Sequence, residues 1–465
     1  MIEDVYWEIP DSVDLEGFLK KHPPEFKYKI DHFYYIIDYI SRAMEMQDLD
    51  DNGGFVNINA AELQKANHNY KLYLDHLLKH HFLRTDMKYI VGKKSFGFLI
   101  NLYKSHKATT QNIEITDWTI RRNKIAEYKA SQEQLKQTTK SYPHLAKWFN
   151  EKLQIDVQGA EQEVEKLFPE QKGAIRGTRK GKSGIWNKRY KAMYSIHKFA
   201  KQEFYYGLDD NVGRFHTNLT NIKKELRNYI TYDGAKLVNV DIKNSQPLFS
   251  TLLLDKNFWN KKGKLISILN TPLQSSPPSL INNTSSNPSS SSNPYSFSIT
   301  IIMIVELLES IDNKVFKQYI DFVDSGNFYE KVSGLLYPNE VFDKKKVKEM
   351  VYTVFFSSNR FMGQPGARPK RDFKRNFPEV YELFRLIKVK NHRLLARILQ
   401  RIESTIVIHY AAKRIAEEKP NLPIFTIHDS IATTIGNEDY VASVIEEEVL
   451  KLTGLKVKLG KEYWD

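Results

Sequence analysis

The stretch Lys236-Leu-Val-Asn-Val-Asp241-Ile-Lys-Asn-Ser-Gln246-Pro-Leu-Phe249 decides how the rest of the chain is interpreted. Its short apolar run ends in a carboxylate, Asp241, and the later run Ile424-Phe-Thr-Ile-His428 ends in the same way, at Asp429. Such runs predict strands, so each is expected to carry one aspartate to its tip. Two carboxylates that are distant in sequence can hold the paired divalent cations of a phosphoryl-transfer site.

Composition favours a polyanionic partner. The chain has 465 residues, a formal net charge of +13 and a sequence pI near 9.3. The positive charge is spread over most of the chain, as expected for a protein that binds nucleic acid, although a basic protein of unrelated role stays possible. The length is ample for two or three domains. The sequence has no cysteine, which excludes disulfides, cysteine zinc sites and thiol nucleophiles.

The sequence shows neither a signal peptide nor a membrane-spanning segment. Residues 1–10 are acidic and lack the basic and apolar parts of a signal peptide. The apolar run 299–308 contains Thr300 and Glu306 and is too short to span a bilayer. We therefore expect a cytoplasmic protein.

Residues 1–110 have the pattern of a small separate domain. Three helices are predicted, over 34–46, 60–65 and 70–81. A hairpin is expected next, turning near Gly92-Lys93-Lys94. This order resembles a winged-helix module, whose second helix and wing could contact a duplex. A protein-docking or packing role is the alternative.

Residues 111–205 are expected to form a helical region that is interrupted by a glycine-rich basic loop at 171–190. A nucleotide-binding phosphate loop would fit Gly181-Lys182-Ser183 only with an earlier glycine at position 176, which is an arginine. The loop is instead expected to contact the phosphate backbone of nucleic acid. The basic residues assigned to this contact are Arg176, Arg179, Lys180 and Lys182.

Residues 206–465 are expected to form one mixed domain with an insertion. Residues 271–297 are rich in serine, asparagine and proline and cannot build a core, so they predict a disordered surface insertion. The domain around it alternates predicted strands and helices.

A predicted helix in this domain carries cations and aromatic rings along one stripe. Lys344, Lys348, Tyr352 and Phe356 follow one another at steps of four residues. Cations near one end and rings near the other could meet a triphosphate and a base. An amphipathic helix with solvated lysines is the structural alternative.

This stripe resembles the fingers-helix motif of family A polymerases, the family of DNA polymerase I and the single-subunit phage RNA polymerases. The motif runs Arg-x3-Lys-x3-(Phe/Met)-x3-Tyr-Gly, with a further phenylalanine five residues after the tyrosine. Lys348 matches the motif lysine, and Tyr352 stands at its sugar-sensing position. The remaining positions are Lys344 for arginine, Phe356 for tyrosine, Ser357 for glycine and Phe361 for the trailing phenylalanine. By resemblance, Lys344 and Lys348 bind the triphosphate, and Phe356 sits at the nascent base pair.

Other segments follow the family's order. Gly213-Arg214 through Asn221-Ile is similar to a segment of DNA polymerase I whose arginine contacts the primer end. Asp241 corresponds to the first catalytic aspartate, and His428-Asp429-Ser430 to the last motif, His-Asp-Glu in the DNA enzymes and His-Asp-Ser in the RNA enzymes. In the helix before it, Gln400 matches a glutamine that touches the minor groove, with Arg393 and Arg397 on nearby turns.

The resemblance implies an α+β fold: a right-hand polymerase with an antiparallel palm sheet, helical fingers, and a helical thumb from residues 111–205. It implies two Mg²⁺ ions, for which Mn²⁺ could substitute, held by Asp241, Asp429 and the carbonyl oxygen of Ile242. Lys348 would offset charge on the leaving pyrophosphate. His428 would orient the primer terminus, because Mg²⁺ seldom binds imidazole.

The implied activity is primer extension with dNTPs. In the DNA enzymes, a glutamate five residues after the first aspartate excludes the 2′-hydroxyl, and Gln246 holds that place here. Phe356 has no hydroxyl to accept a ribose, which also favours dNTPs. Ser430 instead matches the last motif of the RNA enzymes, and Pro247 matches neither the DNA nor the RNA enzymes. No proofreading exonuclease signature precedes residue 205.

Two alternatives stay open. One is a DNA-dependent RNA polymerase or primase. The other is a non-catalytic DNA-binding replication initiator or regulator, which the departures at Lys344, Phe356 and Ser357 support. The expected partners are a DNA template-primer, nucleoside triphosphates and replication accessory proteins, in a setting such as a phage or mobile element.

Overall fold

The computed structural model describes most of the chain. The described residues are 5–47, 49, 53–89, 94–101, 109–169, 184–209, 211–259, 294–339, 341–360 and 362–465, and of 294–300 only the backbone is described. The expected turn at Gly92-Lys93, Phe361, and the four basic loop residues Arg176, Arg179, Lys180 and Lys182 lie outside them.

The N-terminal part combines a helical cluster with two small sheets. Its elements are β1 (Tyr6–Pro10), α1 (Leu15–Lys21), α2 (Ile30–Met46), β2 (Val56–Asn57), α3 (Ala60–Ala66), α4 (Tyr70–Lys79), β3 (Leu83–Thr85), β4 (Gly97–Ile100) and β5 (Thr110–Glu114). Strands β2, β4 and β3 form one antiparallel sheet, and β1 pairs with β5. Because β5 begins at Thr110 and pairs with β1, this part extends beyond residue 110.

The next part is mostly helical and connects the N-terminal part to the central sheet. Its elements are α5 (Trp118–Ser141), α6 (Pro143–Ala146), β6 (Leu153–Ile155), α7 (Val157–Leu167), α8 (Ile185–Ala200), β7 (Tyr206–Leu208), β8 (Phe215–Thr217), α9 (Asn218–Asn221) and the 3₁₀ helix η1 (Lys224–Tyr229). Helix α8 begins at Ile185, so the expected loop at 171–190 is wrong at its C-terminal end. The run Ile185 to Tyr190 carries buried Asn187, Arg189 and Tyr190, and this packing makes it helical.

The central sheet is antiparallel. Its strands are β9 (Ile230–Tyr232), β10 (Ala235–Ile242), β11 (Ile424–Ile427), β12 (Ser430–Thr434) and β13 (Leu459–Tyr463), joined by β6. The order is β11-β12-β10-β9-β6, with β13 also paired to β10. Leu237, Val238 and Val240 of β10 are fully buried, as expected for a central strand. Helix α20 (Glu438–Thr453) packs against β10 and β12.

A second helical part follows β10. Its elements are α10 (Ser245–Leu252), η2 (Lys256–Trp259), α12 (Pro294–Ser310), η3 (Asn313–Phe316), α13 (Lys317–Asp324), α14 (Phe328–Leu336), α15 (Lys344–Phe356), η4 (Pro365–Ala367), α16 (Arg368–Asn376) and α17 (Pro378–Ile387). Helix α12 starts inside the insertion expected at 271–297, so that boundary is wrong. The apolar run after Pro294 favours a helix, and proline suits its first turn.

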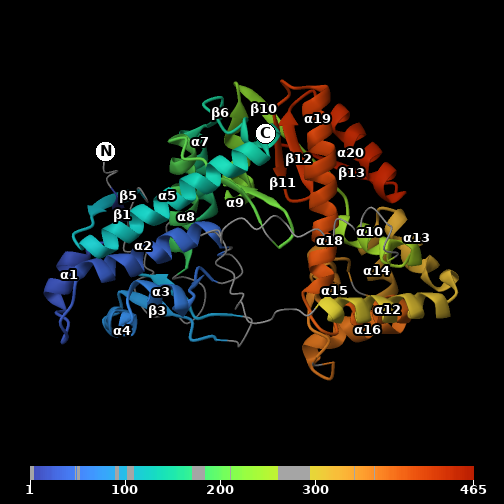
Figure 1. Ribbon diagram of the computed structural model, residues 1–465, viewed down its shortest axis with the longest axis horizontal. Helices are drawn as coiled ribbons and strands as arrows, with labels where there is room; N and C mark the ends of the chain where they lie inside the picture. The colour runs from blue at the N-terminus through green and yellow to red at the C-terminus, as the bar shows by residue number, and fades with distance from the viewer. Residues whose placement is uncertain are drawn as a thin grey trace.

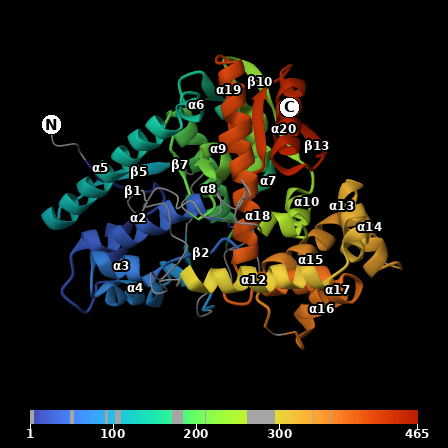
Figure 2. The ribbon, with the colours of Figure 1, turned by 45° about the vertical axis from the view of Figure 1, so that its right-hand side comes forward.

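A long helical rod joins this part to the sheet. It consists of α18 (Leu394–Ser404), a π-helical segment η5 (Thr405–Ala412) and α19 (Lys413–Glu418). In both views the rod runs from the neighbourhood of α15 and α16 up to the sheet (Figures 1 and 2). The N-terminal part lies on one side of the sheet and α12 to α17 on the other.

Helix and antiparallel sheet together give an α+β fold, which confirms the expected class. Within the described part of the chain, no helix has both the length and the apolar character needed to cross a bilayer.

Candidate active site

The sheet register brings the two aspartates to one end of the sheet. Asp241 lies near the end of β10 and pairs with Ser430 of β12 and with Gly460 of β13. Asp429 directly precedes Ser430, in the tight turn between β11 and β12. His428 makes this turn possible by adopting a left-handed backbone conformation, φ 56°. Two residues far apart in sequence are therefore neighbours across a strand pair.

The carboxylates repel one another. Burial raises the pKa of Asp241, and the negative charges of Asp429 and Glu462 raise it further, against smaller opposing effects of Lys243 and Lys224. A raised pKa means that the protein disfavours the ionised form of this carboxyl group relative to water. A bound cation would relieve this repulsion. The aspartate pair is thus suited to a positively charged ligand.

The donor set fits a magnesium site rather than a closed metal cage. Among the described residues, no group of three or more His, Cys, Asp or Glu side chains is arranged to hold an ion. The carboxylates of Asp241 and Asp429 are instead together at the strand end. Mg²⁺ is commonly bound by one or two carboxylates, with waters and substrate phosphates as the other ligands. The oxygen-only chemistry of Asp241 and Asp429 agrees with that pattern.

Gly460 leaves room for the carboxylate of Asp241. A Cβ atom built at Gly460 would lie 2.5 Å from Oδ1 of Asp241, so any side chain at this position would require the carboxylate to shift. The role of Gly460 was not foreseen from the sequence. A glycine inside a terminal strand was the available signal, because such glycines often mark a close approach.

Ser245 is a second residue that sequence reasoning missed. It is the first residue of α10, and its Oγ donates a hydrogen bond of 2.7 Å to Oδ2 of Asp429. The preceding Asn244 has a left-handed backbone and donates its side-chain amide to the carbonyl oxygen of Gly326. The turn that follows Asp241 therefore contacts Asp429 through Ser245.

Glu403 is the third missed residue, and it lies at the centre of the site. It is a buried residue of α18. Nη2 of Arg214 donates to its Oε1 at 3.1 Å, and Nε2 of Gln246 donates to its Oε2. Burial raises the pKa of Glu403 to about 8, and the charge of Asp429 contributes, against Arg214 and Gln246. The available signal was its spacing of three residues from Gln400 on the same helix.

His428 is an exposed residue of the turn. Burial of its ring by the surrounding protein lowers its pKa to about 4, and the cations Arg214 and Arg227 and the nearby His216 contribute, which favours the neutral imidazole. A neutral ring can accept or donate a hydrogen bond without adding charge. Ser430 is used within the turn, since its Oγ donates to the carbonyl oxygen of Ile427 at 2.7 Å.

The predicted stripe lies on helix α15. Lys344 and Lys348 are exposed, and Nζ of Lys348 lies 5.4 Å from the centroid of the Tyr352 ring. The rings of Tyr352 and Phe356 are 5.2 Å apart. Burial raises the pKa of Tyr329, as do its hydrogen bond with Tyr352 and the charge of Asp429. Tyr329, the hydrogen-bond partner of Tyr352, is therefore within electrostatic range of Asp429.

Two buried lysines fix the end of α15. Lys388 donates to the carbonyl oxygens of Val354 and Ser357 at 2.5 and 3.2 Å, and Lys370 donates to that of Ser358 at 2.7 Å. Cations at a helix C-terminus satisfy carbonyl groups that lack partners within the helix. Burial lowers the pKa of Lys388 to about 7, and the charge of Lys370 contributes. Neither lysine was singled out from the sequence.

The remaining candidates lie on several elements. Nη2 of Arg397 donates to Oδ1 of Asn211 at 3.1 Å, next to the Gly213-Arg214 segment. Gln400 is half-buried between Arg397 and Glu403 on α18. Arg393 lies at the start of that helix. Ile242 is buried at the end of β10, beside Asp241.

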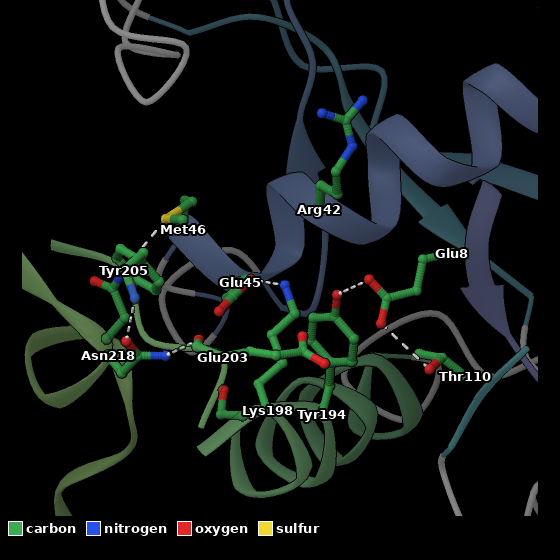
Figure 3. A network of polar contacts seen from close by, with 12 residues as sticks. Glu8, Arg42, Glu45, Met46, Thr110, Tyr194, Lys198, Glu203, Tyr205 and Asn218 are labelled. Carbon is green, nitrogen blue, oxygen red and sulfur yellow. Dashed lines mark hydrogen bonds and ion pairs between the residues drawn. The ribbon is translucent and has the colours of Figure 1, made fainter. Parts of the chain in front are cut away.

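Asn221 is engaged away from the carboxylates. Its side-chain amide contacts the hydroxyl of Tyr205 and the sulfur of Met46, the last residue of α2. Figure 3 shows its partners Met46 and Tyr205, with Asn218, at one end of a polar network that continues through Glu203, Glu45 and Lys198. Asn221 thus helps to join the N-terminal part to the rest of the chain.

Comparisons with known proteins give little. No protein-family model matches the chain, and no curated protein does. Among solved structures, the chain is similar to the polymerase domain of Pol1 from M. smegmatis, in complex with DNA primer-template and dNTP. The match has 10% identity and a TM-score of 0.39, and it covers 72% of this chain and 69% of that chain. A likeness of this size does not establish a family.

Proposed function

We propose that this chain is a template-directed DNA polymerase that adds dNTPs to a primer 3′ end, with a right-hand arrangement of palm, fingers and thumb. The observation that carries the proposal is the meeting of Asp241 and Asp429 at one end of an antiparallel sheet, near the Tyr352 end of a lysine-aromatic helix. Perturbed acids at such a point are typical of functional sites.

Asp241, Asp429 and the carbonyl oxygen of Ile242 would hold two Mg²⁺ ions. Such ions lower the pKa of an attacking hydroxyl and stabilise charge on a leaving group. Ser245 keeps the carboxylate of Asp429 in place, and Gly460 leaves space for that of Asp241.

The reaction is an in-line displacement at the α-phosphate. A bond forms between the primer 3′-oxygen and the α-phosphorus, the bond to the β-phosphate oxygen breaks, and pyrophosphate leaves. Lys344 and Lys348 project into solvent from α15 and can bind the triphosphate. Tyr352 and Phe356 offer half-buried rings to the sugar and the base.

Template and primer would be held by the residues around the aspartates. Arg214 and His428 are proposed to contact the primer end, and Arg393, Arg397 and Gln400 along α18 the minor groove. The basic loop with Arg176, Arg179, Lys180 and Lys182 is proposed to contact the duplex backbone. Asn221, proposed for the same surface, has its amide engaged with Tyr205.

The choice of sugar depends on Gln246. It is 6% exposed and is held by Glu403, so it is a fixed rather than a mobile side chain. A fixed side chain of this length five residues after Asp241 favours dNTPs. An RNA polymerase or primase is the alternative, but the Ser430 on which it rests is used to close the turn.

The N-terminal part supports a second function. The order α2-β2-α3-α4-β3-β4 with a three-stranded sheet is that of a winged helix. Its exposed cations include Lys71 on α4 and Arg84 and Lys88 on the hairpin. We propose that this part contacts duplex DNA, which a non-catalytic initiator would also do. Replacing Lys71 and Arg84 by alanine should weaken duplex binding and lower its salt dependence, whereas Lys451→Ala on α20 should not.

Primer extension tests the main proposal. Wild type, Asp241→Asn and Asp429→Asn are given a primed DNA template, Mg²⁺, and dNTPs or NTPs in separate reactions. Asp233→Asn is the matched control, because Asp233 is an exposed residue of the turn before β10. We expect extension with dNTPs in wild type and control only. Extension with NTPs alone would move the assignment to an RNA polymerase or primase. No synthesis by wild type, with duplex binding intact, would favour the non-catalytic alternative.

A further inference from the structure

Glu403 is a buried acid whose two oxygens have different partners. Its side chain is 1% exposed, yet it comes from the middle of a helical rod rather than from a strand tip. Oε1 accepts from Arg214, which directly precedes β8, and Oε2 accepts from Gln246 in the first turn of α10. Three segments that are distant in sequence therefore meet on one carboxyl group.

This contact fixes Gln246. A glutamine side chain has several rotatable bonds and would sample many rotamers without a partner. Here Nε2 of Gln246 is held by Glu403, while its Oε1 is buried and has no hydrogen-bond partner. The next residue is proline, which restricts the backbone at this turn. Within the described part of the chain, the side chain of Gln246 makes one hydrogen bond, the one to Glu403.

Arg214 stabilises the buried carboxyl group of Glu403. A buried carboxyl group is costly unless it is paired or hydrogen-bonded. Arg214 supplies a cation on the side opposite Gln246, and its own Nε is buried without a partner. The segment proposed to hold the primer end and the residue proposed to select the sugar are thus connected through Glu403.

We propose that Glu403 is a positioning residue for sugar selection, acting through Gln246, and that it supplies from α18 the carboxyl group that the DNA enzymes carry at the position of Gln246. This inference rests on the proposed polymerase function. It assigns the discrimination between deoxyribose and ribose to a pair of residues rather than to Gln246 alone. The geometry also predicts that the acid and the amide can exchange places without loss of the contact.

Four variants and a control test the proposal. They are Glu403→Ala, Glu403→Gln, Gln246→Glu, the double exchange Gln246→Glu with Glu403→Gln, and the control Glu417→Ala. Glu417 is an exposed acid of the same rod. The readout is kcat/KM for a dNTP divided by that for the matching NTP, with kcat and KM determined separately for each.

Glu403→Ala should lower this ratio at least tenfold, chiefly because NTP incorporation improves relative to dNTP incorporation. Gln246→Glu places two acids in contact and should lower both rates. The double exchange retains one acid, one amide and a partner for Arg214, so its ratio should return to within threefold of wild type. Glu417→Ala should leave the ratio unchanged.

Two results would overturn the inference. One is a Glu403→Ala protein that loses dNTP and NTP incorporation in parallel, which would indicate a merely structural role. The other is a double exchange no better than Gln246→Glu alone, and this comparison decides the matter even if Glu403→Ala does not fold. Wild type that extends no primer would instead contradict the proposed function, so the two failures are distinguishable.

Discussion

Two polar clusters of this molecule, one around Asp38 in the N-terminal part and one around Asp241 and Glu403 at the sheet end, differ in how their acids are compensated by cations. In the N-terminal part, the buried acid Asp38 has two cations beside it, Arg42 and Lys124, at 2.8 and 2.7 Å. Burial alone would raise the pKa of Asp38, but Arg42 and Lys124 outweigh it and leave the pKa lowered. At the sheet end, the pKa values of both Asp241 and Glu403 are raised.

The difference separates scaffold from site. The N-terminal cluster pairs its acids Asp38 and Glu45 with cations of the protein, and Figure 3 shows the contact of Glu45 with Lys198. It joins α2 to α8 and serves packing. At the sheet end, burial and the charge of Asp429 raise the pKa values of Asp241 and Glu403, and the nearby cations Lys243 and Arg214 offset this only in part. Functional sites commonly store such unfavourable electrostatics.

The largest expected effect comes from breaking the scaffold. Asp38→Asn would leave the mostly buried Lys124 and the partly exposed Arg42 without their shared acid, and should cost about 3 kcal/mol of unfolding free energy. Urea unfolding followed by circular dichroism measures the loss. A cost below about 1 kcal/mol would show that this cluster is not neutralised in the way described.

Gly460→Ala tests the site by displacement rather than by charge. Because its Cβ would lie 2.5 Å from Oδ1 of Asp241, the carboxylate must move. A displacement of this order should lower the rate of nucleotide incorporation about 100-fold. Gly334→Ala, on α14 with no atom within 4 Å of the added Cβ, is the matched control and should retain activity. Equal activity of the two variants would contradict the geometry of Asp241.

The pH dependence of stability should differ between wild type and Glu403→Gln. The pKa of Glu403 is about 8 in the folded chain and near its ordinary value of 4.5 in the unfolded chain. Between these values the folded state binds more protons, so its stabilisation is full below pH 4.5 and is lost as the pH rises through 8. Thermal unfolding from pH 5 to 8, with a chelator present, should show a decline in wild type that is reduced in the variant. An equal decline in wild type and Glu403→Gln would mean that a group other than Glu403 causes the pH dependence.

The smallest effect is expected for the stability of Asp241→Asn. Removing one of two repelling acids should leave the unfolding free energy unchanged or raise it by up to about 1 kcal/mol, in contrast to Asp38→Asn. Thermal unfolding without divalent cations provides the measurement. A large loss of stability would mean that Asp241 belongs to the scaffold and not to a strained site.

Local patterns in the sequence predicted much of the secondary structure. The strand ending near Asp241, the strand ending before His428 and the helix from Lys344 were each visible in one short segment, and all are present. The helices of the N-terminal part were visible for the same reason, because apolar spacing is a local signal. The assignments of chemical roles to these residues remain predictions.

Features created by distant contacts could not be predicted. The pairing of β1 with β5 joins residues about a hundred positions apart, and no local pattern specifies it. Glu403, Ser245 and Gly460 acquire their roles only when α18, α10 and β13 meet the sheet end. In the sequence, Glu403 is an unremarkable acid of an amphipathic helix.

The most direct test of the central claim is divalent-cation binding at the sheet end. Mn²⁺ binding followed by electron paramagnetic resonance, with a dNTP present, compares wild type, Asp241→Asn and Asp233→Asn. The account predicts that wild type and Asp233→Asn bind Mn²⁺ alike and that Asp241→Asn binds it at least tenfold more weakly. Equal binding by all three proteins would contradict the assignment of Asp241 and Asp429 as the metal site.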